Sequence, residues 1–258
     1  MNAHRTAILV LVVGALTLMS AVALAQNTRS ETSEAQSQIA VSEAQFDFGR
    51  VAQGTSVSHV FWIKNIGDDS VHIQDIKPGC GCTKTPFEPK TLTTGESTHV
   101  ELVFATGQFS SSVTKNAKII SDASGIIPRL LFHADVRPAM DSVDVFAVQP
   151  YKIDLDQNED ADATPNLEYP FMLKNRSDAN LTFSVVSAPD GLVTIDFPAG
   201  KAVAPGGELP FKAVFDKGIA DDVFTKSFTI QASDANKTRL TVPISKTMRW
   251  GPVSTSQR

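Results

Sequence analysis

The chain has only two cysteines among its 258 residues, and they stand one residue apart, at Cys80 and Cys82. Two cysteines are too few to staple a small disulfide-rich scaffold, so hydrophobic cores must hold the fold. The chain also lacks a strong excess of either charge, with a formal net charge of −5 at pH 7. This mildly acidic balance argues against nucleic acid as a partner and against adsorption to an anionic membrane surface.

Sequence motifs that carry common chemistries are missing. The chain has no glycine-rich phosphate loop, no nucleophile elbow and no paired metal-ligand motif of a helix. After residue 25 no segment keeps an apolar period of 3.6 residues over three turns, and no second apolar run is long enough to cross a bilayer. We therefore expect no catalytic residues, no cofactor and no membrane span in the mature chain.

The first 25 residues predict export. A short polar start with Arg5 precedes an apolar run, and Ala23 and Ala25 are small residues where a signal peptidase cuts. An uncleaved anchor is the alternative, because the apolar run is nearly long enough to span a bilayer. Cleavage between Ala25 and Gln26 gives a periplasmic or secreted chain, and the loss of Arg5 changes the net charge from −5 to −6.

Alternating apolar residues predict an all-β protein after a polar leader over residues 26–38. In the segment 56–65, Phe61 and Ile63 fall on one face and Trp62 on the other. Further strands of the same kind, separated by turns, are predicted at 71–76, 99–104, 113–120 and 127–136. The length of the chain favours two domains of about 100 residues.

The pattern is repeated about 110 residues later in the chain. The run that ends at Asn65, Phe-Trp-Ile-Lys-Asn, is echoed by Phe-Met-Leu-Lys-Asn ending at Asn175. The turn that begins with Ser121-Asp122-Ala123 is echoed by Ser233-Asp234-Ala235. Two such copies predict tandem immunoglobulin-like β-sandwiches at 39–138 and 139–250, with a tail over 251–258.

The two copies differ in the residues that carry chemistry. The cysteine turn has the counterpart Ser-Ala-Pro-Asp-Gly over residues 187–191, so the second copy is expected to fold without thiols. The first copy also contains the four histidines of the mature chain, which are His59, His72, His99 and His133. Any soft-ligand chemistry is therefore expected in the first copy.

Several motifs of the first copy resemble a large bacterial family of exported domains of unknown function. They are Phe46-Asp47-Phe48-Gly49, Gly54, the strand over 60–67, and Cys80-Gly81-Cys82-Thr83. The resemblance covers about residues 41–136. It implies an immunoglobulin-like fold related to abnormal-spindle and major-sperm-protein type domains, and it brings no agreed activity.

Four roles are open for Cys80 and Cys82. They form a structural pair, a redox-active disulfide, a Cu(I) site with thiolate ligands, or a mixed disulfide with a partner. A disulfide across one residue needs a bent backbone, which Gly81 permits, and such a tight ring is easily reduced. His72 is the candidate third copper ligand, because its strand runs into the cysteine turn. The other histidines are expected to be exposed or hydrogen-bonded.

Two further patterns have simpler interpretations. The acidic run over residues 156–162 spaces oxygen donors as a calcium loop does, but Ala161 replaces the required glycine and Leu167 the twelfth-position carboxylate. We expect a solvated loop. Glycosylation sequons at Asn175, Asn180 and Asn236 matter only in a eukaryotic secretory pathway, which the bacterial resemblance disfavours.

The sequence predicts an exported, non-enzymatic adaptor of the cell envelope that binds a protein or another envelope component through its sandwich edges or loops. The alternative is an envelope redox or Cu(I)-handling protein that acts through Cys80 and Cys82. The two differ in whether the thiols are required for activity.

Overall fold

The computed structural model describes residues 37–138, 145–157, 168–189, 191, 193–216 and 223–247. Apart from a short 3-10 turn, η1 (Leu155–Gln157), the regular elements of these residues are β-strands, which confirms the all-β prediction. No helix in the described part of the chain is long and apolar enough to cross a membrane. The expected signal segment, its cleavage site and the tail lie outside the described residues.

The first sandwich packs two sheets around one core. One sheet runs in the order β1 (Ile39–Val41), β3 (Ser56–Asn65), β7 (Ser97–Ala105) and β5 (Thr83–Lys84). The facing strands are β2 (Gln45–Ala52), β9 (Arg129–Arg137), β8 (Ser112–Ser121), β4 (Val71–Pro78) and β6 (Lys90–Leu92). Each predicted strand matches an observed one to within two residues at either end. Phe61 and Ile63 are fully buried and Trp62 between them is not, as the alternation predicts.

The second sandwich repeats this plan. Its first sheet runs in the order β10 (Phe146–Gln149), β12 (Glu168–Asn175), β15 (Glu208–Phe215) and β14 (Val193–Asp196). The facing strands are β13 (Phe183–Ser187), β16 (Phe224–Ala232) and β17 (Arg239–Lys246), and β11 (Ile153–Asp154) pairs in parallel with β17. The core between the sheets contains Phe171, Phe183 and Phe228.

Both copies of the repeat have an asparagine at the end of a strand, and its buried hydrogen bonds explain why the repeat retains it. The Nδ2 group of Asn65 donates to the carbonyl oxygens of Asp69 and Leu92 at 2.8 and 3.0 Å. Asn175 makes two such bonds, both at 2.8 Å, at the corresponding places of the second sandwich. Both asparagine residues are fully buried, so the sequon at Asn175 is closed to glycosylation in the folded chain.

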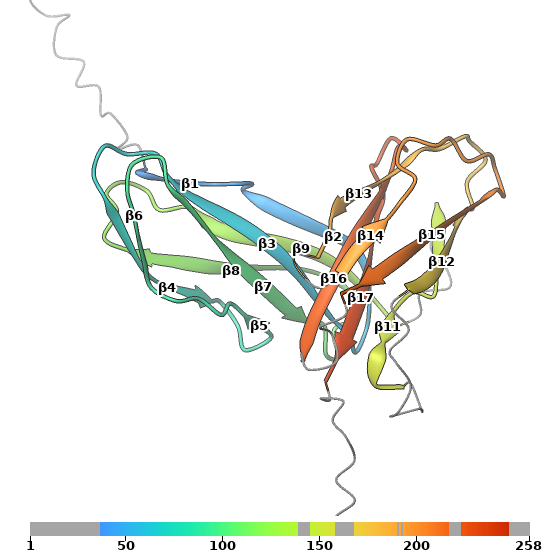
Figure 1. Ribbon diagram of the computed structural model, residues 1–258, viewed down its shortest axis with the longest axis horizontal. Coiled ribbons are helices and arrows are strands. Elements are labelled where there is room, and N and C mark those ends of the chain that lie inside the picture. The colour runs from blue at the N-terminus through green and yellow to red at the C-terminus, as the bar shows by residue number, and fades with distance from the viewer. Residues whose placement is uncertain are drawn as a thin grey trace, which may run out of the picture. The chain divides into compact units, whose positions relative to one another are not determined.

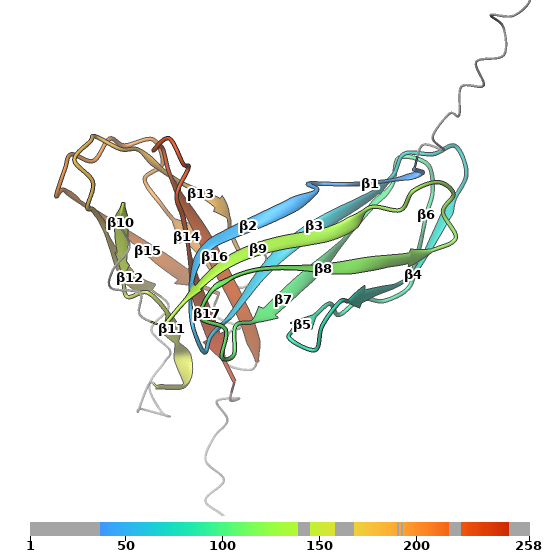
Figure 2. The ribbon, with the colours of Figure 1, turned by 180° about the vertical axis from the view of Figure 1, so that it is seen from behind.

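The two sandwiches are joined through a shared sheet. Strand β2 pairs in parallel with β9 of the first sandwich and, where Arg50 faces Leu240, with β17 of the second. One sheet therefore continues from β13 through β17 and β2 to β6 (Figures 1 and 2). Ala52 of β2 even packs in the second core. The predicted boundary at residue 139 lies outside the described residues.

Candidate functional site

The cysteine turn connects β4 to β5 at one end of the first sandwich. Cys80 and Cys82 form a disulfide, with their Cα atoms 5.3 Å apart. Backbone hydrogen bonds fix both sides of the turn: the N–H of Gly79 donates to the carbonyl of Asn116 at 2.8 Å, and the N–H of Ala105 to that of Cys82 at 2.9 Å. Both cysteines are partly buried. The disulfide is thus anchored by backbone hydrogen bonds on both sides of the turn.

Two buried threonines follow the turn, and their hydroxyl groups have different partners. The Oγ1 atom of Thr83 lies 3.4 Å from Sγ of Cys80 and 3.9 Å from Sγ of Cys82. The Oγ1 atom of Thr85 instead donates to the carbonyl of Ile76 at 2.6 Å. Thr83 is therefore the side chain that the fold aims at the sulfur atoms.

The structure does not bring His72 to the cysteines. It lies near the start of β4, six residues before Pro78, so about 20 Å of strand separates it from the turn at about 3.3 Å per residue. Its Nδ1 atom lies 3.0 Å from Oγ1 of Thr91. The described residues contain no group of three or more His, Cys, Asp or Glu side chains that could hold a metal ion. The strand that carries His72 leads into the cysteine turn, but the His72 side chain itself lies far from the cysteines.

The motif Phe-Asp-Phe-Gly lies in β2, at the junction with the second sandwich. Gly49 has φ of +62°, and a Cβ atom at this position would collide with the backbone carbonyl of Arg239. The guanidinium of Arg239 donates to the carbonyl of Asp47 at 3.0 Å and lies over the ring of Phe46. Glycine is required here because another backbone approaches too closely for any side chain.

Buried serines make a second set of contacts across the junction. The N–H of Ser58 in β3 donates to Oγ of Ser227 in β16 at 2.9 Å, and that hydroxyl donates to the carbonyl of Ser58 at 2.8 Å. Both serines are buried. Because β3 belongs to the first sandwich and β16 to the second, these bonds hold the two sandwiches in register.

His59 also belongs to the junction. Its Nδ1 atom lies 2.9 Å from Oγ of Ser187, in β13 of the second sandwich, and its Nε2 atom 2.8 Å from Oε1 of Glu43. The ring stacks on Phe46 at 3.6 Å between centroids. The prediction of a hydrogen-bonded histidine is confirmed for this residue. No sequence signal pairs it with Ser187, which lies 128 residues later in the chain.

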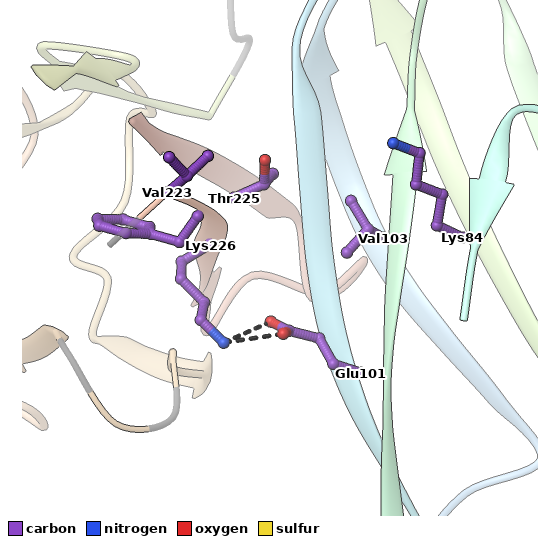
Figure 3. A pocket seen from close by; sticks show the side chains of 7 residues that line it. Lys84, Glu101, Val103, Val223, Thr225 and Lys226 are labelled. Atoms are coloured by element: carbon purple, nitrogen blue, oxygen red, sulfur yellow. Dashed lines mark hydrogen bonds and ion pairs between the residues drawn. The ribbon is translucent and has the colours of Figure 1, made fainter. Parts of the chain in front are cut away.

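A half-buried ion pair crosses the junction on the side of β7. Lys226 donates to both carboxylate oxygens of Glu101, at 2.9 and 2.8 Å. Figure 3 shows the lysine reaching from the second sandwich toward Glu101, with Val103 on the same strand as Glu101 and Lys84 on the neighbouring strand β5. These side chains border a cavity of about 490 Å³.

A groove lies over β3 at the same junction. Its volume is about 330 Å³, and it is lined by His59, Val60 and Trp62 of the first sandwich and by residues 187–189 of the second. Trp62 is 49% exposed. Its ring lies 5.0 Å from that of His99, its cross-strand partner in β7. The alternation along this strand predicts Trp62 on the face opposite Phe61 and Ile63, but no sequence pattern indicates the groove.

The acidic run is described only at its first two residues. Asp156 accepts hydrogen bonds from the backbone N–H and the hydroxyl of Thr247, at 2.7 and 2.5 Å. This carboxylate therefore ties η1 to the residue that follows β17. The remainder of the run, residues 158–162, lies outside the described residues.

Part of the chain matches a known protein family. Residues 39–136 match the family described as "Protein of unknown function (DUF1573)". The match spans the first sandwich and confirms, over that range, the resemblance to a family of unknown function. None of the curated proteins matches the chain.

Solved structures give distant similarities. A protein of unknown function from Porphyromonas gingivalis W83 is 12% identical with a TM-score of 0.33, over 81% of this chain and 100% of its own. The ASH/PapD-like domain 7 of human CEP192 is 9% identical with a TM-score of 0.32, over 40% and 87%. The Caenorhabditis elegans MSP family member WR4 is 6% identical with a TM-score of 0.29, over 39% and 99%.

Proposed function

We propose that this chain is an exported, non-enzymatic adaptor that binds another protein of the cell envelope in the groove over β3. The half-exposed Trp62 in that groove carries the proposal. A tryptophan that presents an apolar ring in a groove is the kind of side chain that dominates the binding energy of protein interfaces.

The junction supports this proposal because it fixes both walls of the groove. One wall is β3 and the other is the end of β13, and the hydrogen bond between His59 and Ser187 links them. The buried bonds between Ser58 and Ser227 hold the same two sandwiches. A preformed groove loses less conformational entropy on binding than a mobile one does.

Site-directed photo-crosslinking in the producing organism tests the adaptor function. A photoreactive phenylalanine analogue at position 62 should give one defined protein adduct. The same analogue at position 126, where Ile126 is 69% exposed and lies outside the groove, should not give that adduct. Purified partner should then bind Trp62→Ala at least about 30-fold more weakly than wild type, as expected for a hot-spot residue. Identical adducts from both positions, or unchanged affinity of Trp62→Ala, would overturn the groove as the binding site.

Export itself is tested separately. The mature chain isolated from the periplasm or the medium should begin at Gln26, which intact-mass measurement detects. A chain that keeps residues 1–25 and sediments with membranes would favour the uncleaved anchor.

A further inference from the structure

The hydroxyl group of Thr83 is buried beside the disulfide, and among the residues that the structure describes its partners are the two sulfur atoms. Thr83 is 3% exposed, and its Oγ1 atom makes no hydrogen bond to nitrogen or oxygen within the described residues. Sulfur in a disulfide is a weak acceptor, whereas a thiolate accepts a strong, charge-assisted hydrogen bond. The hydroxyl is therefore placed for a partner that exists only after the disulfide opens.

We propose that Cys80–Cys82 is an exchangeable disulfide that reacts with a thiolate, and that Thr83 is the positioning residue that stabilises the sulfur of Cys80 as it leaves. This activity goes beyond the adaptor function and does not depend on the groove over β3. The substrate class is a thiol, carried either by a small molecule or by a protein.

The reaction is a two-step exchange. An incoming thiolate attacks Sγ of Cys82 and forms a mixed disulfide, while the Cys80–Cys82 bond breaks and its electron pair stays on Cys80. The hydroxyl of Thr83 donates to this new thiolate. A second thiolate then attacks the sulfur of the bound thiol, which releases a disulfide of the two incoming thiols, and the Cys82 thiolate takes a proton from water. Two thiols are oxidised and one protein disulfide is reduced.

The surroundings of the two sulfur atoms decide which one leaves. Cys80 is closer to the hydroxyl of Thr83, at 3.4 Å against 3.9 Å for Cys82. Cys82 packs against the hydrophobic core of the first sandwich, which disfavours a charge on that sulfur. The thiol whose thiolate is better stabilised leaves faster, so attack is directed to Cys82.

A second cavity, of about 490 Å³, gives the incoming thiol a place beside the turn. It is lined by the residues that come directly before the turn, 75–78, and directly after it, 83–86, together with Val103. Lys77 and Lys84 lie among them and are exposed. Their positive charges favour an approaching thiolate over a thiol.

Equilibration of the full chain in glutathione redox buffers at pH 8 tests the role of Thr83. In Thr83→Val, the ratio of dithiol to disulfide at a fixed buffer should fall about tenfold, the effect of losing one hydrogen bond to a charged group. Thr83→Ser keeps the hydroxyl and should match wild type. Thr85→Val removes the neighbouring buried hydroxyl, which touches no sulfur, and should stay within about twofold of wild type. Circular dichroism checks that each variant is folded.

The site of attack gives an independent readout. Acid quenching during reduction, followed by peptide mass spectrometry, should find glutathione on Cys82. Faster reduction by reduced thioredoxin than by glutathione, per thiolate, identifies a protein as the thiol source, and equal rates identify a small molecule. The proposal is overturned if glutathione is found on Cys80, if wild type yields no dithiol in any buffer, or if Thr83→Val and Thr85→Val behave alike. If Thr83→Val does not fold, a ratio for Thr83→Ser that differs tenfold from wild type overturns it as well.

Discussion

The two sandwiches follow one plan but use the turn after their corresponding strands differently. After β4 the first sandwich has the disulfide of Cys80 and Cys82, bordered by solvent-exposed lysines. At the end of β13 the second sandwich has Ser187, which bonds His59 across the junction. This place in the fold thus holds a disulfide in one copy and a contact between the copies in the other.

A second difference concerns what covers the edge of the shared sheet. In the first sandwich β9 is covered along its length by β2, and in the second β17 is covered by β11 at one end and by β2 at the other. The second sandwich therefore uses a strand of the first to complete its edge. An open strand edge invites pairing with other chains, so the covering also protects the protein from aggregation.

The largest expected effect tests whether the two copies share one folding device. Asn65→Ala and Asn175→Ala should each lower the free energy of unfolding by about 4 kcal/mol, because each removes a fully buried side chain and leaves one buried and one part-buried carbonyl group without a donor. Urea denaturation measures both values, with the exposed Asn180→Ala as control. A loss for one asparagine and none for the other would break the equivalence of the sandwiches.

The junction is tested by two glycines that differ in their neighbours. Gly49→Ala should destabilise the chain by about 3 kcal/mol, because its methyl group collides with the backbone of Arg239. Gly54 has a similar φ of +72° but nothing within 4 Å of its Cβ position, so Gly54→Ala should cost only about 1 kcal/mol. Thermal unfolding of both variants gives the difference, and equal losses would mean that strain at positive φ, not the approach of β17, decides the effect.

The disulfide should matter little for stability. The double variant Cys80→Ser, Cys82→Ser should lose at most about 1–2 kcal/mol, because so short a loop removes little entropy from the unfolded chain. The second sandwich forms the same type of fold without cysteine, which supports this expectation. Far-ultraviolet circular dichroism and urea denaturation measure it. A complete loss of β structure would make the disulfide a structural requirement of the first sandwich alone.

The smallest effect concerns a turn where the copies also differ. Glu96 accepts hydrogen bonds from the backbone and hydroxyl of Thr93, and the backbone bond chiefly lowers the pKa of Glu96. Its contribution is therefore present above the ordinary pKa of a glutamate and is lost as the pH falls through the lowered value. Glu96→Gln should show a slightly smaller loss of stability on acidification below pH 5. Gly207 occupies the corresponding place of the second sandwich. Its carbonyl accepts from the backbone N–H of Asn175, as the carbonyl of Glu96 accepts from the backbone N–H of Asn65. Identical acid profiles of Glu96→Gln and wild type would contradict this.

Much of the architecture was predictable because it depends on local patterns. Alternating residues such as Phe61, Trp62 and Ile63 specify which face of a strand is buried. The repeated asparagine, at positions 65 and 175, identifies equivalent strands in the two copies, but its hydrogen bonds to two carbonyl groups are not predictable from the sequence. Copper binding by Cys80 and Cys82 stays a prediction, but His72 does not lie beside them, because neighbours along a strand are separated by its length.

The sequence by itself determined the all-β class, the repeat, the strands and the confinement of cysteine and histidine to the first copy, because each follows from residue type and spacing along the chain. Only the tertiary structure decided that Gly49 meets Arg239, that His59 meets Ser187, that Trp62 lies in a groove, and that the hydroxyl of Thr83 faces the two sulfur atoms. The first two of these contacts join residues far apart in the chain. All four features depend on which backbone groups and side chains the packing of the sheets brings together, and the order of residue types along the chain does not contain that information.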